Sequence, residues 1–298
     1  MALAKTPLAT IVHPTDFTAP STLAFAHALN IALTTKSQLC LLHVRSESEP
    51  PPGKSEFKHV REVLVRWNRL GAEADAIAIE SELGLRLSSV SVPAKNPRTG
   101  ILDFLDDHPC DLVVLATHEH KGLSQWFDIP VEQTVLRKAR VMSLFLRDGA
   151  RRFVDPNTGA LALRTVLVPI DDSLDCIASL RRIKATVRHF ASGASVQLLH
   201  VGERAPNLLD EDGKSLNLPI IVRKGPVVDT ILEVAENVHA ELIAMPTAGR
   251  HGLLDALRGS TTARILDDAR WPLLAIPVGL TGEQESTGEP QTPDAESA

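Results

Sequence analysis

Residues 11–16 read IVHPTD and residues 167–171 read LVPID, so a short apolar run ending in Pro-x-Asp occurs twice in this chain. Four further blocks recur in the same order in both halves: LLHV at 41–44 and 198–201, DLVVLAT at 111–117 and ELIAMPT at 241–247, Gly-Leu at 122–123 and 252–253, and VLRKA at 135–139 and ILDDA at 265–269. Ordered matches of this kind indicate that the chain contains one internal repeat.

Each half alternates apolar runs of strand length with amphipathic segments of helix length. The expected strands are 9–13, 39–44, 90–92, 112–116, 141–146, 165–170, 196–201, 219–223, 242–245 and 272–277. The expected helices are 20–33, 57–67 with an extension toward 83, 99–107, 131–139, 174–190 with Gly193 as its cap, 227–238 and 261–269. This alternation predicts an α/β fold with two tandem doubly wound domains, each a five-stranded, mainly parallel sheet flanked by helices.

The segments between these elements suggest the domain boundaries. We expect an N-terminal domain at 1–148, a linker at 149–164 that contains a Pro-Asn turn, and a C-terminal domain at 165–278. Within the second domain, 202–218 is too short for a helix with two connections, so one crossover helix should be missing. Residues 279–298 are acidic, contain no Lys or Arg and are rich in Pro, Gly, Ser and Thr, which predicts a disordered tail.

The overall composition excludes several classes of protein. The chain has 298 residues, 44% of them hydrophobic and 23% charged, as in ordinary globular domains. A net charge of −6, an aromatic content of 4% and the absence of Tyr argue against a nucleic-acid or anionic-membrane partner. Three cysteines without a C-x-x-C pair indicate free thiols, and no apolar run reaches membrane-span length, so we expect a cytoplasmic protein.

The loop after the expected strand 242–245 has the features of a phosphate-binding loop. Gly249 is followed, after nine residues, by Gly259-Ser260, which opens a helix with Thr261 and Thr262. Glycines let backbone N–H groups approach an anion closely, and a helix start favours negative charge. Asp171, at the end of another strand of the same half, should face the same crevice and could accept hydrogen bonds from ribose hydroxyls or from donors on the edge of an adenine. The alternative is that Gly-Ser-Thr is an ordinary helix N-cap.

Together with the LLHV and Pro-x-Asp blocks, this loop resembles the universal stress protein family, over residues 5–278 as two tandem copies. The family hallmark is Gly, two residues, Gly, nine residues and Gly-Ser/Thr; Pro246 stands in place of the first glycine. The resemblance implies a site for an adenine nucleotide, ATP or AMP. The sequence indicates no metal site of its own, and the one metal that could be present is Mg²⁺ carried by the nucleotide. Its adenosine contacts would be Pro169, Ile170, Asp171 and Val201; Met245 would lie under the ribose; the phosphates would be held by Gly249, Gly259, Ser260, Thr261 and Thr262. Pro246 has no N–H to donate, so we expect weakened or altered binding.

The first half departs further from the family pattern. Glu119 occupies the place of the second glycine, and Ile129-Pro130 replaces Gly-Ser at the helix start. We therefore expect the first half to be a non-binding structural partner, with Asp16 as a strand-end capping residue. The resemblance also implies that the halves dock as an intrachain pseudo-dimer through 141–146 and 272–277, and a further homodimer is an additional expectation.

The remaining motifs favour no enzyme. We interpret the Gly-Lys-Ser sequences at 53–55 and 213–215 as turns, because a P-loop needs a further glycine five residues earlier. His118-Glu119-His120 lacks the spacing of a zinc site, and we expect His43 and His200 to be hydrogen-bonded core residues. The first hypothesis is therefore a stress-response binding or signalling protein. An interaction scaffold without nucleotide is the second. A nucleotide hydrolase or transferase, for which only His251 and Asp255 could serve, is the third and least favoured.

Overall fold

The computed structural model describes residues 8–16, 21–46, 48, 55–117, 141–147, 149–171, 176–209, 212–247, 261–268 and 270–277. The strands are β1 (Thr10–Pro14), β2 (Gln38–Arg45), β3 (Arg86–Pro93), β4 (Leu112–Thr117), β5 (Met142–Arg147), β6 (Thr165–Pro169), β7 (Ser195–Val201), β8 (Ile220–Arg223), β9 (Leu242–Thr247) and β10 (Leu273–Pro277). The helices are α1 (Ser21–Thr35), α2 (Ser55–Arg66), α3 (Ala76–Leu83), α4 (Pro97–Asp107), α6 (Cys176–Phe190), α7 (Val227–Asn237) and α8 (Thr261–Asp268).

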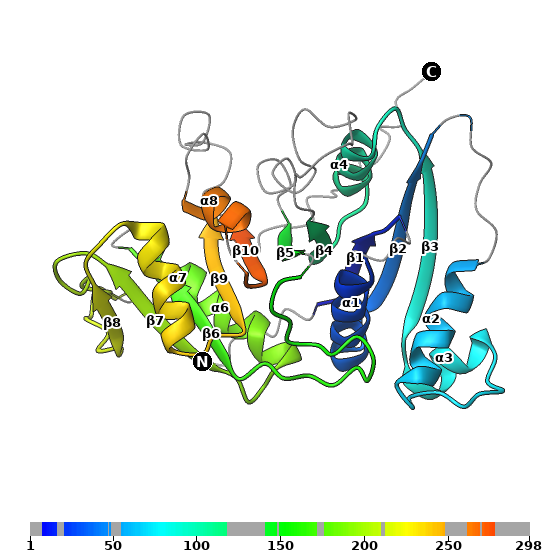
Figure 1. The fold of residues 1–298 in the computed structure, drawn as a ribbon, viewed down its shortest axis with the longest axis horizontal. Coiled ribbons are helices and arrows are strands. Elements are labelled where there is room, and N and C mark those ends of the chain that lie inside the picture. Colours follow the sequence, from blue (N-terminus) through cyan, green and yellow to red (C-terminus); the bar gives the residue numbers. More distant parts are fainter. Residues whose placement is uncertain are drawn as a thin grey trace, which may run out of the picture.

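The described strands form one ten-stranded sheet in the order β3-β2-β1-β4-β5-β10-β9-β6-β7-β8 (Figure 1). Each half contributes five strands, and every ladder inside a half is parallel. The second half repeats the strand order of the first in reverse along the sheet. The predicted fold class of two doubly wound, five-stranded units is confirmed.

The two halves join through their last strands. β5 and β10 pair antiparallel, with Leu273 opposite Phe145, Leu274 opposite Leu144 and Ala275 opposite Ser143. All six of these residues are buried, which is typical of a central strand that side chains cover on both faces. This is the strand contact that the resemblance implied, and it makes the two sheets continuous.

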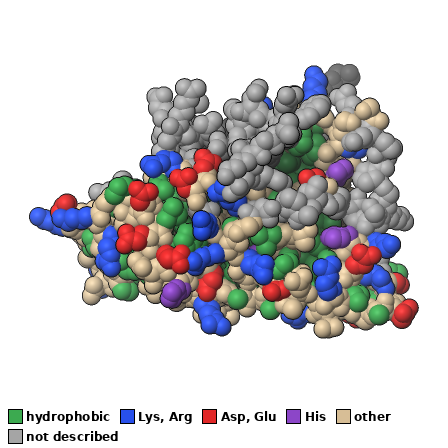
Figure 2. Space-filling view, viewed as in Figure 1, with side chains coloured by type: hydrophobic (Ala, Val, Ile, Leu, Met, Phe, Trp, Pro, Cys, Tyr) green, Lys and Arg blue, Asp and Glu red, His purple; other side chains and the backbone are tan. Residues whose placement is uncertain are grey.

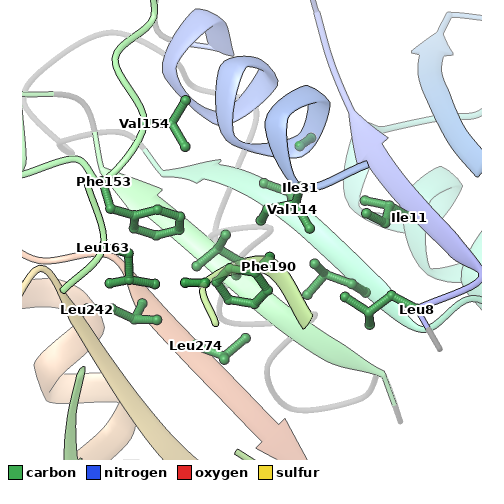
Figure 3. Packing of buried hydrophobic residues seen from close by; sticks show 14 of the residues in the cluster. Leu8, Ile11, Ile31, Val114, Phe153, Val154, Leu163, Phe190, Leu242 and Leu274 are labelled. Carbon is green, nitrogen blue, oxygen red and sulfur yellow. The ribbon is translucent and has the colours of Figure 1, made fainter. Parts of the chain in front are cut away.

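The hydrophobic core is also shared. On one face of the sheet, a single cluster of buried residues includes Ile31 of α1, Val114 of β4, Phe190 of α6 and Leu242 of β9, which come from both halves (Figure 3). Helices α1 and α6, which are the first helices of their halves, contact each other on this face. A second cluster covers the opposite face, and it includes residues of α4, α7 and α8.

The segment 149–164 packs against both halves. The backbone N–H groups of Phe153 and Val154 donate to Nε2 of His27, at 3.2 and 3.1 Å. The ring of Phe153 stacks on Phe190 with 6.1 Å between centroids. Arg151 donates to both carboxylate oxygens of Glu236 at 2.6 Å. The expected turn is present at residues 156–158, and the segment loops past one end of α1 (Figure 1). We call residues 149–164 the strap.

Several element boundaries differ from the expectation. The segment 57–83 is two helices, because Asp75 caps the start of α3 and accepts from the N–H groups of Ile77 and Ala78. Helix α6 ends at Phe190, so Gly193 lies three residues beyond it in a turn and is not its cap. No helix occurs in the described parts of 202–218, which agrees with the prediction that this half lacks one crossover helix. The expected helix at 131–139 and the tail at 279–298 lie outside the described residues.

None of the described helices is both long and apolar enough to cross a membrane. On the face shown in Figure 2, basic and acidic side chains are interspersed over the described residues.

Candidate functional site

At the centre of the sheet in the second half, β6 and β9 pair over only two positions. β6 and β9 are in register only at Val166 with Leu242 and Leu167 with Ile243, although β6 continues to Pro169 and β9 to Thr247. By contrast, β6 pairs with β7, and β9 with β10, over five positions each. In doubly wound sheets, ligands bind outside the carboxyl ends of the strands where the strand order reverses. We call the carboxyl ends of β6 and β9 the switch point of the second half.

Two prolines lie where this ladder ends. The N–H of Ile170 donates to Leu199 of β7, so the preceding backbone position, Pro169, faces β9. The N–H of Ile243 donates to Pro272 on the β10 side, so by the same alternation position 246 faces β6. Both positions are proline, so neither offers a backbone donor to the other strand.

This orientation gives Pro246 a specific consequence. The amide position of residue 246 points away from β10, so the proline removes no hydrogen bond from the β9–β10 ladder. It removes instead a backbone donor that would otherwise face the switch point. The sheet therefore tolerates Pro246, and any ligand at the switch point has one donor fewer than a glycine would provide.

The predicted adenosine contacts lie on both sides of the switch point. Pro169 ends β6, Ile170 follows it, and Asp171 comes next with an exposed side chain. Val201 ends the neighbouring strand β7 and is partly buried. Met245 lies on β9, and its side chain is 6% exposed and belongs to the core. Because the side chains of Ile170 and Met245 are both buried, these two positions can offer a ligand mainly their backbone.

Of the predicted phosphate contacts, Thr261 and Thr262 are the first residues of α8. Thr261 is partly buried and Thr262 is 9% exposed. Gly249, Gly259 and Ser260 lie outside the described residues. The same holds for His118-Glu119-His120, Ile129-Pro130, His251 and Asp255.

The backbone that leads from β6 into Asp171 is hydrogen-bonded to β7. Besides the hydrogen bond from Ile170 N–H to Leu199 at 2.8 Å, the Ile170 carbonyl lies 3.0 Å from Nδ1 of His200. A carbonyl can only accept, so Nδ1 of His200 carries the proton and donates. His200 is a hydrogen-bonded, partly buried residue, as expected. Its link to the Pro-x-Asp turn was not predicted, although the recurrence of His in both LLHV blocks is a signal that could have indicated it.

The first half repeats this arrangement. Thr15 N–H donates to Leu42 at 2.9 Å, and Nδ1 of His43 donates to the Thr15 carbonyl at 3.1 Å. Asp16 follows with an exposed side chain, like Asp171. β1 and β4 are also in register at only two positions, Ile11 with Leu112 and Val12 with Val113. The two halves therefore share the scaffold of the switch point.

The thiol nearest to the second switch point is not activated. Cys176 begins α6, and burial, together with the negative charge of Asp171, raises the pKa of its thiol. A raised pKa keeps a thiol protonated and unreactive. All three cysteines are free. Among the described residues there is no group of three or more His, Cys, Asp or Glu side chains that could hold a metal ion.

A comparison with protein families matches residues 8–147 and 207–277 to the universal stress protein family. The chain belongs to this family. The matched regions include β1 to β5 and β8 to β10, whereas β6 and β7 of the second half lie between them.

Solved structures agree with this assignment at the level of the fold. A universal stress protein from Archaeoglobus fulgidus DSM 4304 is 17% identical with a TM-score of 0.59, and the match covers 91% of this universal stress protein and 96% of that chain. A functionally unknown protein from Pseudomonas aeruginosa PAO1 is 15% identical with a TM-score of 0.60. The match covers 92% of the present chain and 94% of that chain. No curated protein matches the sequence.

Proposed function

We propose that this universal stress protein is a stress-response binding protein whose C-terminal half binds an adenine nucleotide, ATP or AMP, at the β6–β9 switch point. The observation that carries the proposal is the open end of this ladder, with Asp171 on one side, directly after the hydrogen-bonded backbone of Ile170, and Pro246 on the other. The N-terminal half serves as a structural partner, and the β5–β10 ladder is the interface of an intrachain pseudo-dimer. The proposal assigns the protein no catalytic activity.

Each residue would have a defined part in binding. Asp171 is exposed directly after β6 and would accept hydrogen bonds from the ribose hydroxyls. Pro169, Ile170 and Val201 would contact the adenosine at the adjoining ends of β6 and β7. Thr261 and Thr262 stand at the start of an eight-residue helix, where free N–H groups and the helix dipole favour phosphate. A Mg²⁺ ion would be bound through the nucleotide phosphates, which is how proteins commonly bind this ion.

The second candidate is an interaction scaffold that binds no nucleotide. Pro246 is the observation that favours it, because this residue removes a backbone donor from the switch point. The two candidates differ in whether the remaining contacts suffice for binding.

Calorimetric titration of the purified protein with ATP and with AMP, in the presence of Mg²⁺, tests the proposal. We expect about one nucleotide bound per chain. Asp171→Ala should weaken binding by about tenfold, which is the loss expected for a charged hydrogen-bond acceptor. Asp16→Ala is the matched control, because Asp16 occupies the same place in the first half, and it should leave affinity unchanged. Pro246→Gly should strengthen binding several-fold, by roughly one hydrogen bond.

Mass spectrometry of ligand released from freshly purified protein provides an independent measurement. Recovery of an adenine nucleotide supports the proposal. If no nucleotide is recovered and millimolar ATP and AMP give no heat with either the native protein or Pro246→Gly, the scaffold is the better description.

A further inference from the structure

We propose that His200 is a positioning residue of the nucleotide site, which acts by holding the peptide that leads into Asp171. This inference rests on the proposed nucleotide function. It adds a residue outside the set that the sequence assigned to the site, and it gives that residue a physical task.

The geometry begins with Ile170, whose two backbone groups are both bound to β7. Its N–H donates to Leu199 at 2.8 Å, and its carbonyl accepts from Nδ1 of His200 at 3.0 Å. The carbonyl of Ile170 and the N–H of Asp171 belong to one planar peptide unit. Fixing the direction of the carbonyl therefore fixes the peptide plane from which Asp171 starts. Only rotation about the N–Cα bond of Asp171 is then left in the backbone to set the direction of its side chain.

The strand geometry makes this restraint necessary. Beyond Leu167, β6 has no registered partner on its β9 side, and neither Pro169 nor Pro246 can donate across the switch point. Both backbone hydrogen bonds of Ile170 are thus made to β7. The backbone of the next residue, Asp171, is in addition hydrogen-bonded by Cys176 of α6. Of the two hydrogen bonds that hold Ile170, the one from His200 is made by a side chain and can be removed without changing any backbone.

Gly202 provides the room that the imidazole needs. A Cβ atom at position 202 would lie 2.3 Å from Nε2 and 2.9 Å from Cδ2 of His200, closer than real Cβ atoms approach. Gly202 is itself held in place, because its N–H donates to Arg223 at 2.8 Å. The ring of His200 therefore lies against this backbone and cannot move toward it.

The first half provides the control for the effect. Nδ1 of His43 makes the same hydrogen bond to Thr15, which precedes Asp16. In the proposed function the first half does not bind nucleotide, so the same side-chain loss there should cost stability and leave affinity unchanged. A general effect of removing a strand histidine would appear in both halves.

The experiment measures ATP affinity by calorimetry for His200→Leu, His200→Asn and His43→Leu. Leucine keeps much of the apolar volume and has no donor, whereas the asparagine amide can replace the Nδ1–H group. We expect His200→Leu to weaken binding by about fivefold to tenfold, which corresponds to the net contribution of one hydrogen bond. His200→Asn should restore affinity to within about twofold, and His43→Leu should bind like the native protein. Thermal melting of each variant verifies that it is folded.

A double-mutant cycle tests the route of action. If His200 acts through Asp171, then adding His200→Leu to Asp171→Ala should weaken binding no further. Equal affinity of His200→Leu and the native protein would overturn the inference while leaving the nucleotide function intact. So would fully additive losses in the cycle, or an equal loss in His43→Leu. Absence of binding by the native protein itself would overturn the proposed function, and the inference with it.

Discussion

At the scale of single residues, two buried histidines stand out because both are 0% exposed. His27 donates through Nδ1 to Leu23 at 2.8 Å and accepts the two strap N–H groups at Nε2, so it is needed as a neutral ring. His13 donates to the Val114 carbonyl at 2.9 Å, and its Nε2 has no hydrogen-bond partner among the described residues. The pKa of each imidazole is lowered to about 4, mainly by burial. The charge of Arg152 contributes to the lowering at His27, and the hydrogen bond to Val114 and the charge of Asp16 partly offset it at His13.

These pKa values predict a loss of stability in mild acid. Above pH 6.5 both histidines are neutral in the folded and the unfolded chain, and they add no pH dependence. Between pH 6.5 and pH 4 the unfolded chain binds protons that the folded chain does not, so the free energy of unfolding falls by about 3 kcal/mol for each histidine. Urea unfolding at pH 7, 5.5 and 4 measures this decrease.

The internal repeat supplies a control for this prediction. Val168, which is 1% exposed, occupies the position of the second half that corresponds to His13 in the first half. His13→Val should therefore change the stability at pH 7 by less than about 1 kcal/mol. It should also remove about half of the loss between pH 6.5 and pH 4. An unchanged pH dependence in this variant would contradict the assignment of the titration to His13.

At the scale of elements, the strap is a hairpin that docks on α1 and on the end of α2. Asp155 N–H donates to Ala160 at 3.0 Å, and Gly159 N–H donates to the Asp155 carbonyl at 2.8 Å. The indole N–H of Trp67 donates to Pro156 at 3.0 Å. Gly159 has φ of +67°, and a Cβ there would lie 2.4 Å from the Trp67 ring. The hairpin therefore needs glycine for both its conformation and its close approach to Trp67.

Gly159→Ala should destabilise the protein by about 2 to 4 kcal/mol, which combines left-handed backbone strain with displacement of a buried ring. Gly84→Ala is the matched control, because Gly84 has φ of +66° and a Cβ there would meet no atom within 4 Å. Gly84→Ala should lower the free energy of unfolding by only about 1 kcal/mol, which is the contribution of the left-handed backbone strain alone. Urea unfolding of both variants measures the difference, and equal losses would show that the Trp67 contact contributes nothing.

At the scale of the whole molecule, the two halves share a sheet, a core cluster and the strap. The β5–β10 ladder makes the sheet continuous, and the cluster around Phe153 and Phe190 draws side chains from both halves (Figure 3). Arg151 adds a contact on the second half, since its guanidinium lies 4.7 Å above the Trp271 ring while it also binds Glu236. Neither half can expose its part of this interface without exposing buried apolar surface of the other.

We therefore expect the two halves to unfold together. Of the three methionines, Met142 lies on β5 and Met245 on β9, so each half carries one buried reporter without any substitution. In a urea titration followed by NMR of methyl-labelled methionine, both native signals should disappear at one midpoint. Midpoints separated by more than about 0.5 M would show that the halves unfold independently.

Much of the fold and part of the site could be predicted from local patterns. The repeat, the alternation of strands and helices and the missing crossover helix are properties of short segments, and the structure confirms them. The structure also places Pro169, Ile170, Asp171 and Val201 at adjoining strand ends. The direction in which Pro246 faces could not be predicted, because it depends on which neighbouring strand each backbone amide meets. The partners of His27 and His200 likewise come from distant segments.

The sequence alone determined that the chain is a duplicated α/β protein, since hydrophobic periodicity and turn residues act over a few neighbouring positions. Only the tertiary structure decided that 149–164 packs as a strap on both halves. It also decided that the β6–β9 ladder ends after two positions, with Pro169 and Pro246 facing each other's strand, and that His200 donates to the carbonyl before Asp171. These features depend on hydrogen bonds and packing between segments far apart in the chain, and such contacts exist only once the sheet and its helices are assembled.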